Sequence, residues 1–221
     1  MNGITTTDTA DQHWNKIWGE IEEGSKWLTP EPDVKRWAKV LTRGAAILDL
    51  GAGVGRHALA LQAAGFEVTA LDAAPEGLAE IDQANTGVKT QIGRMNHLPF
   101  ADNEFDHVLS WNVIYHGDDT ILLDTISEVR RVLKPGGTFM LTMLSKRRLW
   151  IDREKLNSPR EISRNTWVFD EDGSDKRHPH YYCGALEMLA LFQGFEVISM
   201  EDREHDKAGS WHWHLILERQ S

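Results

Sequence analysis

Short apolar runs alternate with amphipathic stretches over the middle of the chain. Five runs of strand length are rich in aliphatic residues and predict buried strands at 45–50, 66–71, 88–92, 105–110 and 138–144. Helical stretches lie between them at 56–64, 75–84 and 119–133, with glycine or proline near their ends. Because strands and helices alternate, the pattern predicts βαβ units and a mainly parallel sheet.

Two regions outside this pattern are predicted as additions to the sheet. Residues 1–43 form a helical N-terminal extension, in which Pro30 and Pro32 separate two helices. Residues 145–180 are polar and rich in charge, without a clear period. We expect this second stretch to be an insertion that covers the functional site.

The C-terminal part of the chain predicts a helix at 184–192 and strands at 195–200 and 211–218. Only about ten residues separate the two strands, too few for a crossover helix, so an antiparallel hairpin at one side of the sheet is expected. Residues 1–221 therefore predict one α/β domain of Rossmann-like, doubly wound architecture. Its sheet has seven strands, is mostly parallel with an antiparallel C-terminal hairpin, and carries helices on both faces.

Composition narrows the classes of protein that fit this fold. Hydrophobic residues make up 41% and charged residues 26% of the chain, as in globular proteins. No apolar run approaches the ~18 residues of a membrane span, and the polar start of the chain lacks a secretory signal. Cys183 is the only cysteine, which fits a reducing cytoplasm. The net charge of -10, without a basic stripe, disfavours nucleic acid as a partner.

A glycine-rich turn carries the first functional signal. The segment DLGAGVG, from Asp49 to Gly55, lies between a predicted strand and a predicted helix, and Asp72 ends the next strand 21 residues after Gly51. The carboxyl ends of adjacent parallel strands share one crevice, where the acid can accept the hydroxyls of a ribose. In a dinucleotide fingerprint the third glycine would stand at Arg56, so NAD is disfavoured. The pattern indicates a ligand with a ribose and without phosphates.

These residues resemble the class I methyltransferases that depend on S-adenosylmethionine (SAM). ILDLGAGVGRHALAL is similar to their first motif, VTALDAAPEGL to the second, and GRMNHLPFADNEFDHVLSWNVIYHG and RVLKPGGTFMLT to later ones, so the resemblance covers residues 45–144. The tryptophan-rich start and the late stretches HPHYYCGALEMLALFQGFE and SWHWHLILER are similar to the tellurite-resistance and thiopurine type of small-molecule methyltransferase.

The resemblance implies a set of cofactor contacts. Those around the methionine part of SAM are Asp49, Gly51, Ala52 and Gly53. Those around the ribose and adenine are Asp72, Ala73, Met95 and Asn96, and those at the sulfonium end are Trp111 and Asn112. One position departs from the family: Arg94 replaces an acid that often bonds the adenine amino group, and arginine only donates.

Candidate catalytic residues follow the fourth strand and lie in the late polar stretch. Tyr115, His116 and His180 are candidates for taking a proton from the methyl acceptor. Alternatively, His116 is a loop histidine bonded to the backbone, and His180 packs the insertion. The pairs His178/His180 and His212/His214 suggest chelation, but without a cysteine cluster or an HExxH motif no metal is expected. The nine tryptophans are either packing residues or, in part, the wall of a pocket.

The expected activity is transfer of a methyl group from SAM to a small-molecule acceptor, by in-line displacement in a closed pocket. Alternatives are a methyltransferase acting on a macromolecule and a noncatalytic SAM-binding protein. The expected protein is cytoplasmic, without a membrane or nucleic-acid partner, and either a monomer or a homodimer. The acceptor atom is not determined by these motifs.

Overall fold

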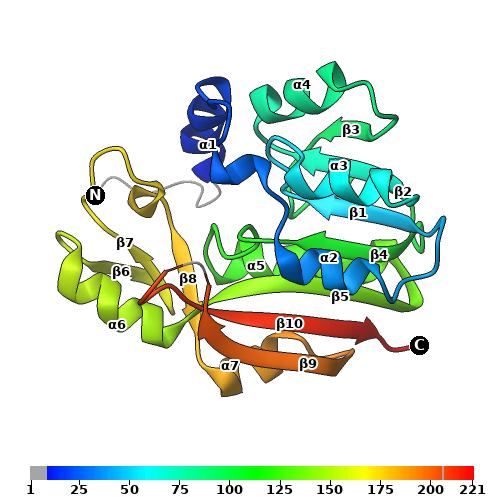
Figure 1. The fold of residues 1–221 in the computed structure, drawn as a ribbon. Helices are drawn as coiled ribbons and strands as arrows, with labels where there is room; N and C mark the ends of the chain where they lie inside the picture. The colour runs from blue at the N-terminus through cyan, green and yellow to red at the C-terminus, as the bar shows by residue number, and fades with distance from the viewer. Residues whose placement is uncertain (1–8, 206) are drawn as a thin grey trace.

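A ten-stranded sheet runs through the computed structural model, which describes residues 9–205 and 207–221. Its centre consists of parallel strands in the order β3 (Lys89–Ile92), β2 (Glu67–Asp72), β1 (Ala46–Leu50), β4 (Phe105–Ser110) and β5 (Leu133–Ser145). Beyond β5 lie two antiparallel strands, β10 (Trp211–Arg219) and then β9 (Phe195–Glu204) (Figure 1). The predicted parallel sheet and its C-terminal hairpin are confirmed.

Three further strands come from the polar stretch after β5. β8 (His180–Cys183) runs parallel to the end of β5, and β7 (Thr166–Val168) and β6 (Arg160–Ser163) continue antiparallel. The same stretch forms α6 (Lys146–Lys155) and the 3-10 turn η2 (Asp175–Arg177). All seven predicted strands are present, and these three add to them. They escape the pattern analysis because strands such as β6, with sequence REIS, bury little.

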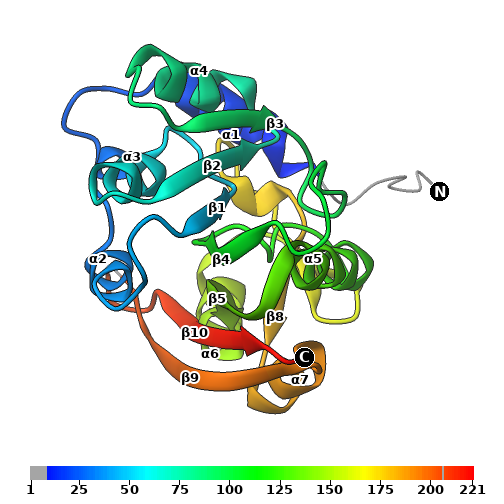
Figure 2. The same ribbon diagram turned by 90° about the vertical axis from the view of Figure 1, so that its right-hand side faces the viewer.

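Alternate side chains of the central strands pack into two separate hydrophobic cores, one on each face of the sheet. In β1, Leu48 and Leu50 pack on one face of the sheet, whereas Ile47 packs on the other. The helices behind Ile47 are α2 (Pro32–Ala38), α3 (Arg56–Ala63) and α4 (Pro75–Gln83). The helices behind Leu48 are α5 (Asp119–Val132) and α7 (Ala185–Leu191). Figure 2 shows α2 and α3 on one side of the strands and α5 on the other, which confirms helices on both faces.

The N-terminal extension has three short pieces. α1 (Ala10–Gly19) and η1 (Lys26–Leu28) precede α2, which begins at Pro32. α1 packs beside α4 above the carboxyl ends of the parallel strands (Figure 1). No helix among the described residues has the length and apolarity needed to cross a membrane.

The end of β1 buries a carboxyl group. Asp49 is 1% exposed, and its Oδ2 has no hydrogen-bond partner among the described residues. Burial raises the pKa of Asp49 to about 7, although Arg56 and the backbone N–H of Ala58 favour the charged form. The carboxyl is therefore held in an environment that favours its protonated form.

A buried polar network fastens the inserted segment to the sheet. The hydroxyl of Tyr182 on β8 donates to Asp152 Oδ2 of α6 at 2.8 Å and accepts from Lys176 Nζ at 2.9 Å. Arg148 Nε donates to Asp152 Oδ1 at 2.7 Å. One hydroxyl thus bridges a buried cation and a buried anion, and this places η2 and the start of β8.

Tyr182→Phe should destabilise the protein by ~1–3 kcal/mol, because Lys176 and Asp152 each lose a buried partner. The matched control is Tyr181→Phe, whose hydroxyl only accepts from Asn165 Nδ2 at 3.3 Å. The free energies of unfolding of both variants can be measured in urea. Equal losses in the two variants would contradict a special role of the Tyr182 bridge.

The pH dependence of stability in the variant Asp49→Asn tests whether the buried carboxyl has a raised pKa. Between about pH 4 and 7 the folded Asp49 keeps a proton that the unfolded chain releases, so wild-type stability falls relative to the variant as pH rises. The shift in pKa corresponds to a relative change on the order of 4 kcal/mol. Urea unfolding of both proteins across this range measures it, and a constant difference between them would show that Asp49 ionises normally.

Candidate active site

A cavity of about 300 Å³ lies at the carboxyl ends of β1, β2 and β4, a volume typical of small-ligand pockets. The residues that the sequence predicted for the site and that line this cavity are Gly51, Ala52, Gly53, Asp72, Ala73, Met95, Trp111, Asn112, Tyr115, His116 and His180. Asp49 and Asn96 are outside the lining. The cavity therefore gives no support to ligand contacts by these two residues.

The loop after β1 owes its shape to glycine. Gly51, Gly53 and Gly55 have φ of +77°, +54° and +81°, in the left-handed region that other residues rarely adopt. A Cβ on Gly53 would lie 2.8 Å from the ring of Trp18. The loop thus combines a sharp turn with close packing against α1.

Asp72 connects this loop to the end of β2. Its carboxylate accepts from the backbone N–H of Gly53 at 2.7 Å and of Ala74 at 2.8 Å. Burial raises its pKa, and these hydrogen bonds act against that shift. The acid therefore lies beside the glycine loop, as the ribose assignment requires.

An acid from α1 lies beside Arg94. Asp11 lines the cavity, and its Oδ2 lies 3.3 Å from Arg94 Nη2. Its Oδ1 is buried and has no hydrogen-bond partner among the described residues. The sequence analysis missed Asp11 because the pairing joins segments 83 positions apart.

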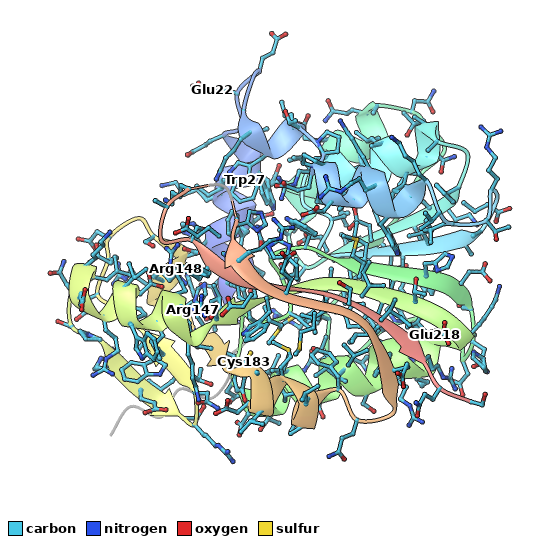
Figure 3. All side chains as sticks on the ribbon, turned by 60° about the horizontal axis from the view of Figure 1, so that its bottom comes forward. Glu22, Trp27, Arg147, Arg148, Cys183 and Glu218 are labelled. Atoms are coloured by element: carbon cyan, nitrogen blue, oxygen red, sulfur yellow. The ribbon has the colours of Figure 1, made fainter. Side chains whose placement is uncertain are left out.

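Tryptophans form one wall of the cavity. Trp14 and Trp18 stack with ring centroids 5.1 Å apart, Trp27 meets them edge-on, and all three line the cavity. Trp111, the residue after β4, also lines the cavity, and its ring N–H donates to His205 Nε2 at 3.1 Å. Figure 3 labels Trp27 together with Arg148 of α6, another lining residue from a different element. Both roles proposed for tryptophan, packing and pocket wall, are therefore present.

Three polar side chains of the cavity lining lie close together, and they are His116, Asp175 and His180. Asp175 Oδ2 lies 3.3 Å from His180 Nε2 and 3.6 Å from His116 Nε2. Burial lowers the pKa of His180 to about 3, and the two histidines hold the pKa of Asp175 well below its usual value. Tyr115 packs on His116 with centroids 4.7 Å apart. Sequence reasoning missed Asp175 because nothing in its polar segment marks it.

The other predicted candidates have structural contacts. His178 Nδ1 bonds Thr9 Oγ1 at 2.9 Å, and Trp213 Nε1 donates to the carbonyl of Cys183 at 3.0 Å. The rings of His212 and His214 each pack on His205. Burial raises the pKa of the Cys183 thiol, so this group is a poor nucleophile.

Comparisons with known proteins agree with this geometry. A family model described as a methyltransferase domain matches residues 47–137. An uncharacterised methyltransferase of Synechocystis is 35% identical over 50% of this chain and 52% of its own length. A protein named a methyltransferase in Encephalitozoon cuniculi is 32% identical over 71% of this chain and 73% of its own length. The chain spans about half the length of several other curated relatives it matches.

A solved methyltransferase structure has a similar fold. The crystal structure of 1,6-didemethyltoxoflavin-N1-methyltransferase from Burkholderia thailandensis, with bound 1,6-didemethyltoxoflavin and S-adenosylhomocysteine, has a TM-score of 0.70. Its sequence identity is 16%, and the match covers 96% of this chain and 87% of that one. The glycine loop, the acid at the end of β2 and these relatives together show that the chain belongs to the family of SAM-dependent methyltransferases.

Proposed function

We propose that the protein transfers the methyl group of SAM to a small-molecule acceptor bound in the same cavity. The observation that carries this proposal is that both sets of residues line one cavity. We assign the glycine loop and Asp72 to its cofactor end, and Tyr115, His116 and His180 to its acceptor end. A cofactor and an acceptor bound at these ends would meet near Trp111 and Asn112.

The reaction requires little covalent chemistry from the protein. An acceptor atom attacks the methyl carbon, the S–CH3 bond breaks, and the electron pair passes to sulfur, which yields S-adenosylhomocysteine. Alignment of acceptor and methyl group is worth ~7–11 kcal/mol of the barrier. An acceptor that arrives protonated must also lose a proton, and His116, His180 and Tyr115 are the predicted catalytic residues at that end.

We assign the cofactor contacts to residues that line the cavity. Asp72 would accept hydroxyls of the ribose, while Ala73 and Met95 would flank the adenine. Asp11 offers the acceptor oxygen that Arg94 cannot offer, since its Oδ1 has no partner within the described chain. The stacked tryptophans on α1 would exclude water from the methionine part.

A small acceptor is favoured by the walls around the acceptor end. α1 and the inserted segment both contribute lining residues, for example Trp14 and Lys176, which leaves limited space for a large substrate. The Burkholderia enzyme of similar fold carries bound 1,6-didemethyltoxoflavin, the compound in its name, in its crystal. The tellurite-resistance and thiopurine similarity stays a prediction, and it places thiols and oxyanions first in a panel of acceptors.

Methyl-labelled SAM offered with such a panel should give a labelled product that requires the acceptor. Thiols, metalloid oxyanions, amines and hydroxylated aromatics would be compared with a protein substrate mixture and with RNA. Labelling of the macromolecules alone would contradict the small-molecule assignment. Binding of SAM without transfer to any acceptor would favour the noncatalytic alternative.

Asp72→Ala should weaken SAM binding by ~1–3 kcal/mol, because a charge-assisted hydrogen bond to the ribose is lost. Glu80→Ala on the exposed side of α4 is the control and should leave the affinity unchanged. Calorimetric titration measures both, with circular dichroism as the check that the fold is intact. An unchanged affinity in folded Asp72→Ala would exclude the proposed ribose contact.

A further inference from the structure

Three side chains from separate segments converge at the acceptor end of the cavity. His116 follows β4, Asp175 begins η2, and His180 begins β8, and all three line the cavity. Their candidate ligand atoms lie within 4.8 Å of one another. Two ligands of one tetrahedral ion, each about 2.0–2.1 Å from it, are about 3.3 Å apart. Asp175 Oδ2 lies 3.3 Å from His180 Nε2 and 3.6 Å from His116 Nε2, so both distances are close to that spacing.

Backbone contacts hold the two histidines in place. His116 and His180 form an isolated antiparallel bridge. Gly117 N–H donates to the carbonyl of Pro179 at 3.1 Å, and Tyr181 N–H donates to that of Tyr115 at 2.8 Å. The two imidazoles, with ring centroids 4.7 Å apart, are therefore set by main-chain pairing.

Both rings use their other nitrogen in the same way. His116 Nδ1 lies 2.8 Å from the carbonyl of Val113, and His180 Nδ1 lies 2.8 Å from the carbonyl of His178. A carbonyl only accepts, so each Nδ1 carries the hydrogen. This is the usual arrangement of metal-binding histidines, in which a backbone carbonyl orients the ring and leaves Nε2 as the ligand.

Three hydrogen-bond acceptors then face one another, namely Nε2 of His116, Nε2 of His180 and Oδ2 of Asp175, and both histidines are buried. His116 is 7% exposed and His180 is 0% exposed. His116 Nε2 has no hydrogen-bond partner among the described residues. Both rings face the same carboxylate oxygen, so satisfying both by protonation would place two imidazolium charges side by side. One cation among the three atoms satisfies all of them at once.

We propose that His116, Asp175 and His180 bind a divalent transition-metal ion such as Zn²⁺, with at least one coordination position open to the cavity. Two imidazoles and one carboxylate are a common ligand set for such ions. The ammonium of Lys176, the next residue, is held by Tyr182 at 2.9 Å and Asp152 at 3.5 Å. This proposal departs from the expectation of no metal, which weighed the pairs His178/His180 and His212/His214 and the lack of a cysteine cluster or an HExxH motif.

A catalytic role for the ion rests on the proposed methyltransferase function. Binding of the ion to the three side chains does not depend on that function. An acceptor oxygen, sulfur or nitrogen at the open position would lose its proton to solvent more readily. The acceptor would then attack the methyl carbon of SAM as the S–CH3 bond breaks. The histidines act here as ligands, and the ion replaces the base that an imidazole would otherwise supply.

Metal binding can be measured without methyl transfer. The full chain, treated with a chelator and then titrated with Zn²⁺ by calorimetry, should bind one equivalent. Asp175→Asn and His116→Gln should each weaken this binding by at least ~10–100-fold, since even supporting residues of metal sites have effects of that size. The matched control is His178→Gln, which changes a histidine two positions from His180 and should bind like the wild type.

Co²⁺ provides a second readout, because its visible absorption reports coordination by the protein. The bands expected for wild type and for His178→Gln should be absent in Asp175→Asn. Binding of S-adenosylhomocysteine, measured in parallel, establishes that each variant is folded. Absence of a stoichiometric Zn²⁺ site in the wild type, or equal binding of Zn²⁺ by Asp175→Asn, overturns the proposal. A proton shared between Asp175 and a histidine would then be the cation in this cluster. Failure of the methyltransferase function would appear separately, as absent SAM binding or transfer.

Discussion

The carboxylate of Asp72 is the contact on which the cavity depends. It accepts N–H groups from Gly53 in the loop after β1 and from Ala74 beyond β2, and so joins the ends of two adjacent strands. Burial of this acid carries a cost, which raises its pKa. The structure offsets part of that cost with backbone donors, and the same orientation directs the carboxylate toward the cavity.

The N-terminal extension completes the cavity from the other side. Because Gly53 lacks a side chain, the ring of Trp18 approaches the loop closely, and Trp14 and Trp27 pack around it. Asp11 enters on the same helix and pairs with Arg94. The N-terminal segment thus contributes aromatic rings and one acid to the same cavity as the glycine loop.

The central fold could be predicted because its signals are local. The run AILDL contains the alternation that divides Leu48 and Ile47 between two cores, and glycine is required where φ is positive. Tyr115, His116 and His180 were candidates from the sequence, but Asp175 and the contact between the two histidines could not be predicted in this way. Asp175 lies in a polar segment without periodicity, and the pairing of His116 with His180 is made by backbone contacts between distant segments. No spacing within either segment encodes that contact.

The same reasoning explains the strands that were missed. β8 is fully buried but has only four residues, and it pairs with the end of β5 and with β7, which has only three. β6 has no buried residue, so it shows no apolar pattern. Tertiary pairing rather than local pattern places them, and the Tyr182 network fastens them beside the cavity.

The most direct test of the account is calorimetric titration of the purified protein with SAM, S-adenosylhomocysteine and NAD. The account predicts micromolar binding of both sulfur ligands and no binding of NAD, since the glycine loop and Asp72 suit a ribose without phosphates. Binding of NAD alone, or of none of the three, would contradict it and would mean that the cavity beside Asp72 is not a SAM site.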